Sequence, residues 1–191
     1  MSHAHDAGAH GLNVFGALSL AVAERLSAQV EQAAGHRGAA PAALAALATF
    51  LDGSSIDVLR RPLGLTHSAA VRLTDRLADA GLLTREAGED GRSVSVRLTP
   101  GGRAAAERIL SARERALEQV LAPLAPPERA DLSRLHGKLL AGITGGRADA
   151  GHICRLCDSV ACGHDAGRCP VTKAADAAEA ASAAHAARLA G

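Results

Sequence analysis

Four cysteines lie within sixteen residues of a chain that has no other cysteine. They are Cys154, Cys157, Cys162 and Cys169, in the spacing C-x2-C-x4-C-x6-C. Four thiolates can hold tetrahedral zinc or an iron–sulfur cluster, and a final Cys-Pro step also occurs in ferredoxin ligand runs. In a reducing compartment such spacing favours metal binding over disulfides. We expect zinc as the cofactor, with an iron–sulfur cluster as the alternative.

Two histidines near these cysteines are alternative ligands. His164 would replace one thiolate in a Cys3His site that leaves Cys162 free, and His152 is a further candidate. Another interpretation has no stable metal and uses the thiols as a reversible dithiol switch. So short a segment could hardly fold without an ion, which favours the metal.

The chain before the cysteine segment is expected to form helices and strands. Within it, residues 54–81 predict two helices joined by a tight turn. The first is expected over Ile56–Leu63, and Gly64 follows it as a helix stop. Pro62 lies near its end and makes that end short or irregular.

The second helix is expected over residues 66–80, with Thr66 as its N-cap. Its buried stripe comprises Ala70, Leu73, Leu77 and Ala80. The opposite side carries His67, Ser68, Val71, Arg72 and Asp75. A methyl-bearing side chain such as Val71 suits contact with thymine, and Arg72 suits guanine or phosphate. The alternative is a solvated face with one stray valine.

Two short alternating segments, residues 82–85 and 93–98, come next and predict paired strands. The polar turn between them contains Asp90 and Arg92, which lie two apart across a glycine. An aspartate so placed could hold an arginine that reaches into a DNA minor groove. The alternative is a charged, solvated loop without a role.

These stretches resemble the MarR family of winged-helix regulators over about residues 40–120. Asp90-Gly91-Arg92 and the later Leu98-Thr99-Pro100-Gly101-Gly102 are similar to the family's D-x-R wing and its LT-x-x-G exit. The resemblance implies a homodimer that binds double-stranded DNA, with the helix over 66–80 in the major groove and the wing in the minor groove. The implied DNA-binding residues are His67, Ser68, Val71, Arg72, Asp90 and Arg92. Pro62 inside the first helix departs from the family pattern.

The two helices and the hairpin over residues 54–98 form the reading head. Amphipathic segments flank it, over about residues 12–34, 41–51, 100–122 and 128–143. The last has Leu132, Leu135, Leu139 and Ile143 in register. The fold class is therefore mainly α with a small β-hairpin wing, a winged helix-turn-helix with flanking dimerisation helices. The expected divisions are a disordered tail (1–11), the winged-helix domain (12–145), a glycine-rich linker (142–151), the Cys-rich metal-binding segment (152–171) and an Ala-rich helix or tail (172–191).

Composition excludes several classes of partner. Aromatic residues are 1% of the chain, so the stacking of bases on aromatic side chains is excluded as a way of binding single-stranded nucleic acid. The net charge of +1 gives no general affinity for nucleic acid, and any useful positive charge must be local. The sequence has no apolar run of membrane-spanning length, and residues 12–23 lack a convincing cleavage site. We expect a cytoplasmic protein without a membrane partner.

The sequence therefore predicts a transcriptional regulator, expected to be a repressor, and not an enzyme. If the cysteines act as a sensor, the regulator responds to metal or to redox state. A small-molecule inducer of unidentified structure is also compatible with such a regulator. One alternative is a winged-helix module that binds protein and not DNA. Another is a small thiol oxidoreductase that uses Cys154 and Cys157, although the chain lacks the βαβ context of a thioredoxin-like site.

Replacement of Arg92 by alanine tests the wing assignment. The variant is expected to bind the cognate promoter more weakly than the wild type, because the minor-groove contact is lost. A gel shift with both proteins measures the difference. Unchanged binding would show that the wing is not a reading element.

Overall fold

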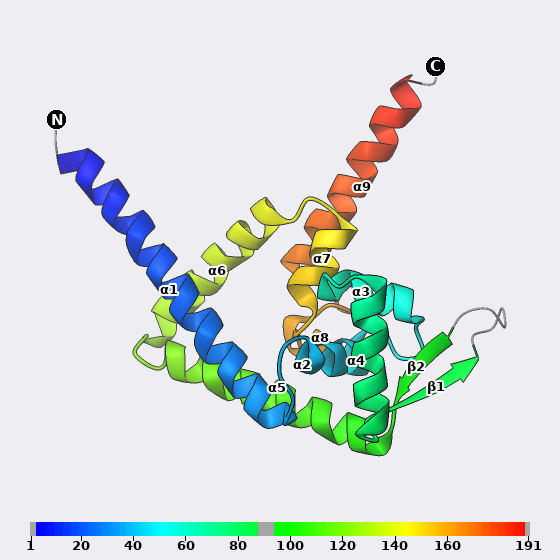
Figure 1. Ribbon diagram of the computed structural model, residues 1–191. Coiled ribbons are helices and arrows are strands. Elements are labelled where there is room, and N and C mark those ends of the chain that lie inside the picture. The colour runs from blue at the N-terminus through cyan, green and yellow to red at the C-terminus, as the bar shows by residue number, and fades with distance from the viewer. Residues whose placement is uncertain (1–2, 88–93, 190–191) are drawn as a thin grey trace.

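The computed structural model describes residues 3–87 and 94–189, and these are mainly helical (Figure 1). The elements are α1 (His3–Ala34), α2 (Ala40–Thr49), α3 (Ile56–Leu63), α4 (His67–Asp79), β1 (Leu83–Ala87), β2 (Val94–Leu98), α5 (Pro100–Leu121), α6 (Pro126–Ile143), α7 (Arg147–Cys154), α8 (Ser159–Cys162) and α9 (Pro170–Leu189). The strands form a two-stranded antiparallel sheet, so the expected fold class agrees with the structure. In the described ranges, no helix is long and apolar enough to cross a membrane.

Helix α2 lies at the centre of the core. Residues 40–47 are all buried, and Leu44 and Leu47 expose no surface. Most of the other positions are alanine, whose small side chain lets the neighbouring helices α1, α3 and α5 come close. Leu59 of α3, Leu77 of α4 and Ile109 of α5 complete the same cluster. The reading head is thereby fixed to the long helices.

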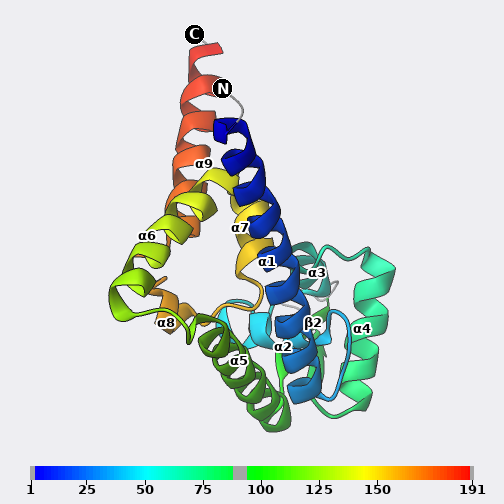
Figure 2. The ribbon, with the colours of Figure 1, turned by 90° about the vertical axis from the view of Figure 1, so that its left-hand side faces the viewer.

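The long helices α1 and α5 lie side by side over the C-terminal half of α1 (Figure 1). Val30 and Ala34 of α1 are buried there. The N-terminal half of α1 and the C-terminal half of α9 project from the same side of the molecule (Figure 2). On this part of α1, large apolar side chains such as Phe15 and Leu18 are more than half exposed, at 56% and 53%.

The hairpin is anchored at its base by buried apolar residues and by the segment before α3. Leu83 pairs with Leu98, and both are buried. The buried Val96 donates its N–H to the Ser54 carbonyl at 2.9 Å, and its own carbonyl accepts from Gly53 N–H at 3.1 Å. The wing is therefore joined through its backbone to the start of α3.

The LT-x-x-G stretch makes the corner between the wing and α5. Thr99 caps α5 by accepting from Gly102 N–H at 3.0 Å, and its hydroxyl donates to the Gly81 carbonyl at 2.7 Å. The Leu82 carbonyl lies directly against the Cα of Gly102, where a methyl group would overlap its oxygen. Glycine is needed at position 102 because of this close approach.

Two of the expected boundaries differ from the structure. Residues 3–11, expected within a disordered tail, are helical, because a helix nucleated further along extends at little cost through alanine-rich sequence. The glycine-rich linker is reduced to residues 144–146, since Gly142 lies inside α6 and Gly151 inside α7. Gly145 N–H donates to Asp149 Oδ2 at 2.8 Å, which closes the start of α7.

Helix α6 does not bury its apolar stripe within the chain. It has no buried residue, and Leu135, Leu139 and Ile143 are 46%, 51% and 66% exposed. The regular spacing correctly predicted a helix, but spacing does not reveal what covers its apolar side. Among the described residues, packing on α9 therefore covers only part of this stripe.

Two neighbouring glycines test the corner between the wing and α5. Gly102→Ala is expected to destabilise the protein by roughly 1–3 kcal/mol, because the added methyl group must displace the Leu82 backbone or Leu98. Gly101→Ala is the control, since a methyl group at that position meets nothing closer than 3.6 Å. Urea unfolding of both variants measures the difference, and equal stabilities would contradict the packing described.

Candidate nucleic-acid interface and cysteine cluster

Local capping sets the geometry of the two-helix head. Ser55 caps α3 by accepting from Val58 N–H at 3.3 Å, and Thr66 caps α4 by accepting from Ala69 N–H at 3.2 Å. Between the helices, Gly64 takes a left-handed conformation with φ 64°, which favours glycine. Pro62 does not stop α3, which continues to Leu63. The expected helix-turn-helix is therefore present.

The exposed side of α4 carries most of the predicted reading residues. His67, Ser68 and Arg72 are exposed, as is Arg76 one turn further on. Arg76 was not among the predicted residues, although its spacing of four from Arg72 places both on one face. Extending the helical pattern by one turn would have found it.

The buried stripe of α4 differs in two places from the prediction. Ala80 follows the helix and is exposed, whereas Thr74 is fully buried. Val71, predicted to face away from the core, is half-buried and packs against it. The stripe is wider than spacing suggested because Thr74 lies one turn from Val71, and its hydroxyl donates to the Val71 carbonyl at 2.9 Å. Part of the Val71 side chain is therefore structural.

Asp75 joins α4 to the wing. Its carboxylate pairs with Arg85 of β1, whose guanidinium also donates to Thr74 Oγ1 at 3.0 Å. This links the reading helix to the first strand. Asp90 and Arg92, the predicted wing-tip residues, lie outside the described residues, so their roles stay predictions.

The four cysteines are all free thiols on α7, α8 and the turns that follow them. A hydrogen bond from the Cys154 thiol lowers the pKa of Cys157 to about 6, against the opposing effect of burial, and the same contact raises the pKa of Cys154. Burial raises the pKa of Cys162. Burial also opposes ionisation of Cys169, but hydrogen bonds from Thr172 and Val171 outweigh it and lower its pKa. In each of the pairs 154/157 and 162/169, one thiol thus has a lowered pKa and the other a raised pKa.

The donor chemistry of this cluster suits zinc, but its arrangement is that of two thiol pairs. Within residues 3–87 and 94–189, no three His, Cys, Asp or Glu side chains converge to hold a metal ion. The predicted alternative ligands have other partners: His164 Nδ1 lies 3.0 Å from Thr172 Oγ1, and His152 Nδ1 lies 2.9 Å from the Pro62 carbonyl oxygen. The metal assignment stays a prediction that rests on the cysteine spacing.

The Cys-rich segment is docked on the reading head and is not a separate unit. Gly151 of α7 approaches Pro62 of α3 closely, and a methyl group at position 151 would lie 3.6 Å from the Pro62 Cβ. The His164 ring meets the Phe50 ring edge-on, with centroids 5.4 Å apart. Between these two contacts lies a mainly apolar cavity of about 520 Å3. It is lined by residues of the reading head and of the Cys-rich segment, among them Cys154, Cys162 and Cys169.

His152 closes the C-terminal end of α3. The carbonyls of Arg60 and Arg61 already accept from Leu65 and Gly64 N–H, both at 3.1 Å. The next carbonyl, that of Pro62, has His152 as its partner. Because a carbonyl can only accept, His152 must carry its proton on Nδ1. A residue from the appended segment thus completes the helix end that precedes the reading helix.

Comparison with known proteins agrees with this geometry. Residues 37–93 match the MarR family model. A solved MarR-family transcriptional regulator from Silicibacter pomeroyi is 31% identical, with 66% of this chain and 87% of that chain covered and a TM-score of 0.53. The chain belongs to the MarR family. The predicted resemblance is confirmed.

Other MarR-like structures extend the comparison. The Mycobacterium tuberculosis MarR family protein Rv2887, solved in complex with DNA, is 28% identical, with 65% of this chain and 95% of that chain covered and a TM-score of 0.52. YusO from Bacillus subtilis is 20% identical, with 71% and 96% covered and a TM-score of 0.62, and supports the fold alone. No curated protein matches the chain.

Proposed function

We propose that this MarR-family chain is a transcriptional regulator that binds specific sites in double-stranded DNA through α4. The observation that carries the proposal is the exposed, polar side of α4, with His67, Ser68 and Arg72, on a capped helix-turn-helix. A helix of about 10–12 Å diameter fits the major groove, which is about 12 Å wide. The related Rv2887 protein was solved in complex with DNA, which supports DNA binding by this chain.

Within this proposal the reading residues have different roles. Arg72 donates to guanine O6 and N7 or to a phosphate, and Ser68 and His67 contact the groove near the start of the helix. Val71 has less side chain to offer a thymine methyl group, because it also packs on the core. Arg92, which Asp90 would hold, is assigned to the minor groove on the family resemblance.

We propose that the regulator acts as a homodimer. Large apolar side chains on the N-terminal half of α1 and on α6 are exposed in the described residues, and a second copy would bury both sets. Two α4 helices would then read half-sites about one DNA turn apart. A dimer that occupies an operator within a promoter excludes polymerase, so we propose repression. A promoter fusion that becomes more active when the regulator is deleted would support this sign.

The first test is a gel shift with DNA from upstream of the chain's own gene. A shifted complex with two chains per duplex is expected, with a dissociation constant on the order of 10 nM. A scrambled duplex of the same length should bind at least a thousandfold more weakly. Binding to neither duplex would favour the protein-interaction alternative, and equal affinity for both would contradict sequence-specific binding.

Leu139→Glu tests the dimer. A buried charge at this position should separate the subunits, so sedimentation equilibrium is expected to give the 19.3 kDa chain mass in place of twice that mass. Val160→Glu is the matched control, because Val160 is 81% exposed and belongs to α8, which is not one of the two helices assigned to the dimer. A Leu139→Glu protein that remains dimeric would contradict the assignment.

We further propose that the cysteine cluster is the sensory part of the regulator, with zinc as the favoured ligand and an iron–sulfur cluster as the alternative. The docking of α7 on α3 supports this, because a change at the cysteines would reach the reading head through His152 and Pro62. When bound, zinc would hold the segment closed. The candidate ligands are Cys154, Cys157, Cys162 and Cys169, and binding requires the two thiol pairs to approach one another.

His152→Ala tests this connection. Loss of one hydrogen bond of about 1 kcal/mol at the end of α3 is expected to weaken DNA binding roughly fivefold, while zinc stays at about one per chain. DNA titration and elemental analysis with an absorption spectrum, on protein purified without oxygen, provide the two measurements. His185→Ala, on the exposed end of α9, is the control. Unchanged DNA affinity would refute the connection. Iron in place of zinc in the elemental analysis, together with visible absorption, would identify the bound group as an iron–sulfur cluster.

A further inference from the structure

Three arginines surround one groove beside the reading helix. Arg72 and Arg76 come from α4, and Arg37 comes from the turn between α1 and α2. The groove has a volume of about 250 Å3 and an apolar floor that includes Ala69 and Leu73. All three arginine side chains are exposed. The other side chains that line the groove are apolar, so the guanidinium groups are the charged groups that a ligand there would meet.

Other arginines of the head are paired with carboxylates. Asp57 pairs with Arg60 and Arg61, Asp75 pairs with Arg85, and Asp52 pairs with Arg97 and Arg103. By contrast, Arg37, Arg72 and Arg76 form no ion pair with any residue of 3–87 or 94–189. Three positive charges without a described counter-charge around one groove favour an anionic ligand.

The turn that carries Arg37 has a defined shape. Gly35 and Gly38 have φ angles of 67° and 70°, a left-handed conformation that favours glycine at both positions. Gly38 N–H donates to Glu31 Oε1 of α1 at 2.8 Å. Arg37 therefore projects from a turn that is held on both sides, and little order would have to be gained when it binds a ligand.

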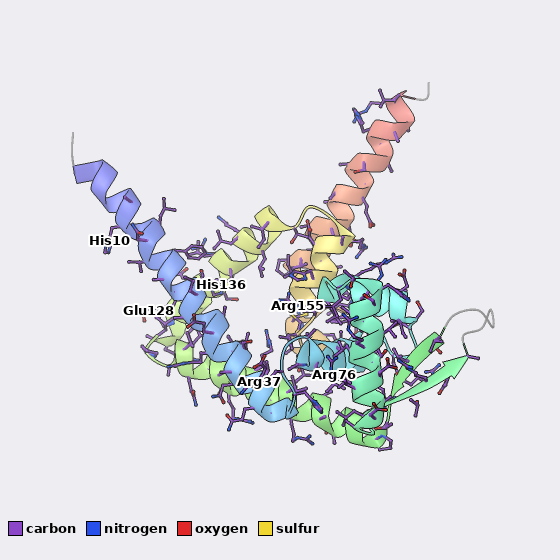
Figure 3. All side chains as sticks on the ribbon, in the orientation of Figure 1. His10, Arg37, Arg76, Glu128, His136 and Arg155 are labelled. Atoms are coloured by element: carbon purple, nitrogen blue, oxygen red, sulfur yellow. The ribbon has the colours of Figure 1, made fainter. Side chains whose placement is uncertain are left out.

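The position of the groove indicates which anion it would meet. The α1–α2 turn lies on one side of α4 and the wing on the other (Figure 1). Figure 3 labels Arg37 on the α1–α2 turn and Arg76 on the neighbouring helix α4. When a helix enters the major groove, its central side chains reach base edges and those at its flanks reach the phosphates that border the groove. Arg37 and Arg76 occupy such a flank.

We propose that Arg37 and Arg76 clamp a phosphodiester of the DNA backbone and so set the position of α4 in the groove. This inference rests on the proposed DNA-binding function and adds a residue from outside the helix-turn-helix. Arg72 lies between the two roles, at the border of the groove and on the reading face. In a dimer, the clamp occurs once per half-site. Its contribution does not depend on base sequence, because all phosphates are alike.

The test is the salt dependence of binding by Arg37→Ala and Arg76→Ala. Fluorescence anisotropy follows binding to the upstream duplex and to a scrambled duplex between 50 and 200 mM salt. Each variant should bind both duplexes about tenfold more weakly at physiological salt. The slope of log K against log salt should decrease by about 2 per dimer, since each phosphate contact contributes about 0.9.

Arg188→Ala is the matched control, because Arg188 is exposed in the last turn of α9, outside the reading head and outside the two helices assigned to the dimer. Its affinity and slope should equal those of the wild type. Inorganic phosphate at constant ionic strength should not compete with the duplex; competition at millimolar levels would identify a free-anion site and overturn the proposal.

Two further results would also overturn it. One is an Arg37→Ala protein with wild-type slope and affinity. The other is a loss confined to the upstream duplex, which would indicate base reading. If the wild type binds the upstream duplex in either case, the proposed function stands and only the clamp fails. If the wild type binds no duplex, the proposed function itself fails. Thermal unfolding followed by circular dichroism confirms that each variant is folded.

Discussion

The burial of α2 is the constraint on which the rest of the structure depends. All residues from 40 to 47 are buried, so this short helix contacts the long helices and the reading head at the same time. Its alanines permit the close approach, and Leu44 and Leu47 fill the remaining space. A larger residue on α2 would move the head relative to α1 and α5, and with it the spacing between the two heads of the proposed dimer.

At the wing, glycines allow neighbouring groups to come close to the backbone. Gly102 contacts the Leu82 carbonyl, and Gly53 contacts the Arg97 guanidinium. The ion pair between Asp75 and Arg85 then ties the wing to α4. These contacts leave the exposed face of α4 and the α1–α2 turn free to meet a ligand. The head is thus rigid where it packs and charged where it is exposed, which is what a DNA-binding surface requires.

The Cys-rich segment is joined directly to the winged helix. His152 closes α3 through the Pro62 carbonyl, and Pro62 also lies against Gly151. Pro62, a departure from the family pattern, is therefore one point where the added segment meets the head, and Phe50, in contact with His164, is another. The ion pairs of Arg147 with Asp176 and Glu179 join α7 to α9, so the segment holds its shape through charge as well as through its small core around Cys169 and Val171.

Local sequence determined the elements of this protein and much of its reading face. Thr66, Gly64 and the spacing of Leu73 and Leu77 specify α4, because capping and helical period act over a few residues. The four cysteines likewise identify themselves by spacing. Only the tertiary structure decided that Val71 is partly structural, that Leu135, Leu139 and Ile143 of α6 stay exposed among the described residues, and that Arg37 lines the same groove as Arg76. These facts depend on which segments meet in space, and contacts between residues far apart in sequence leave no periodic signal in the sequence itself.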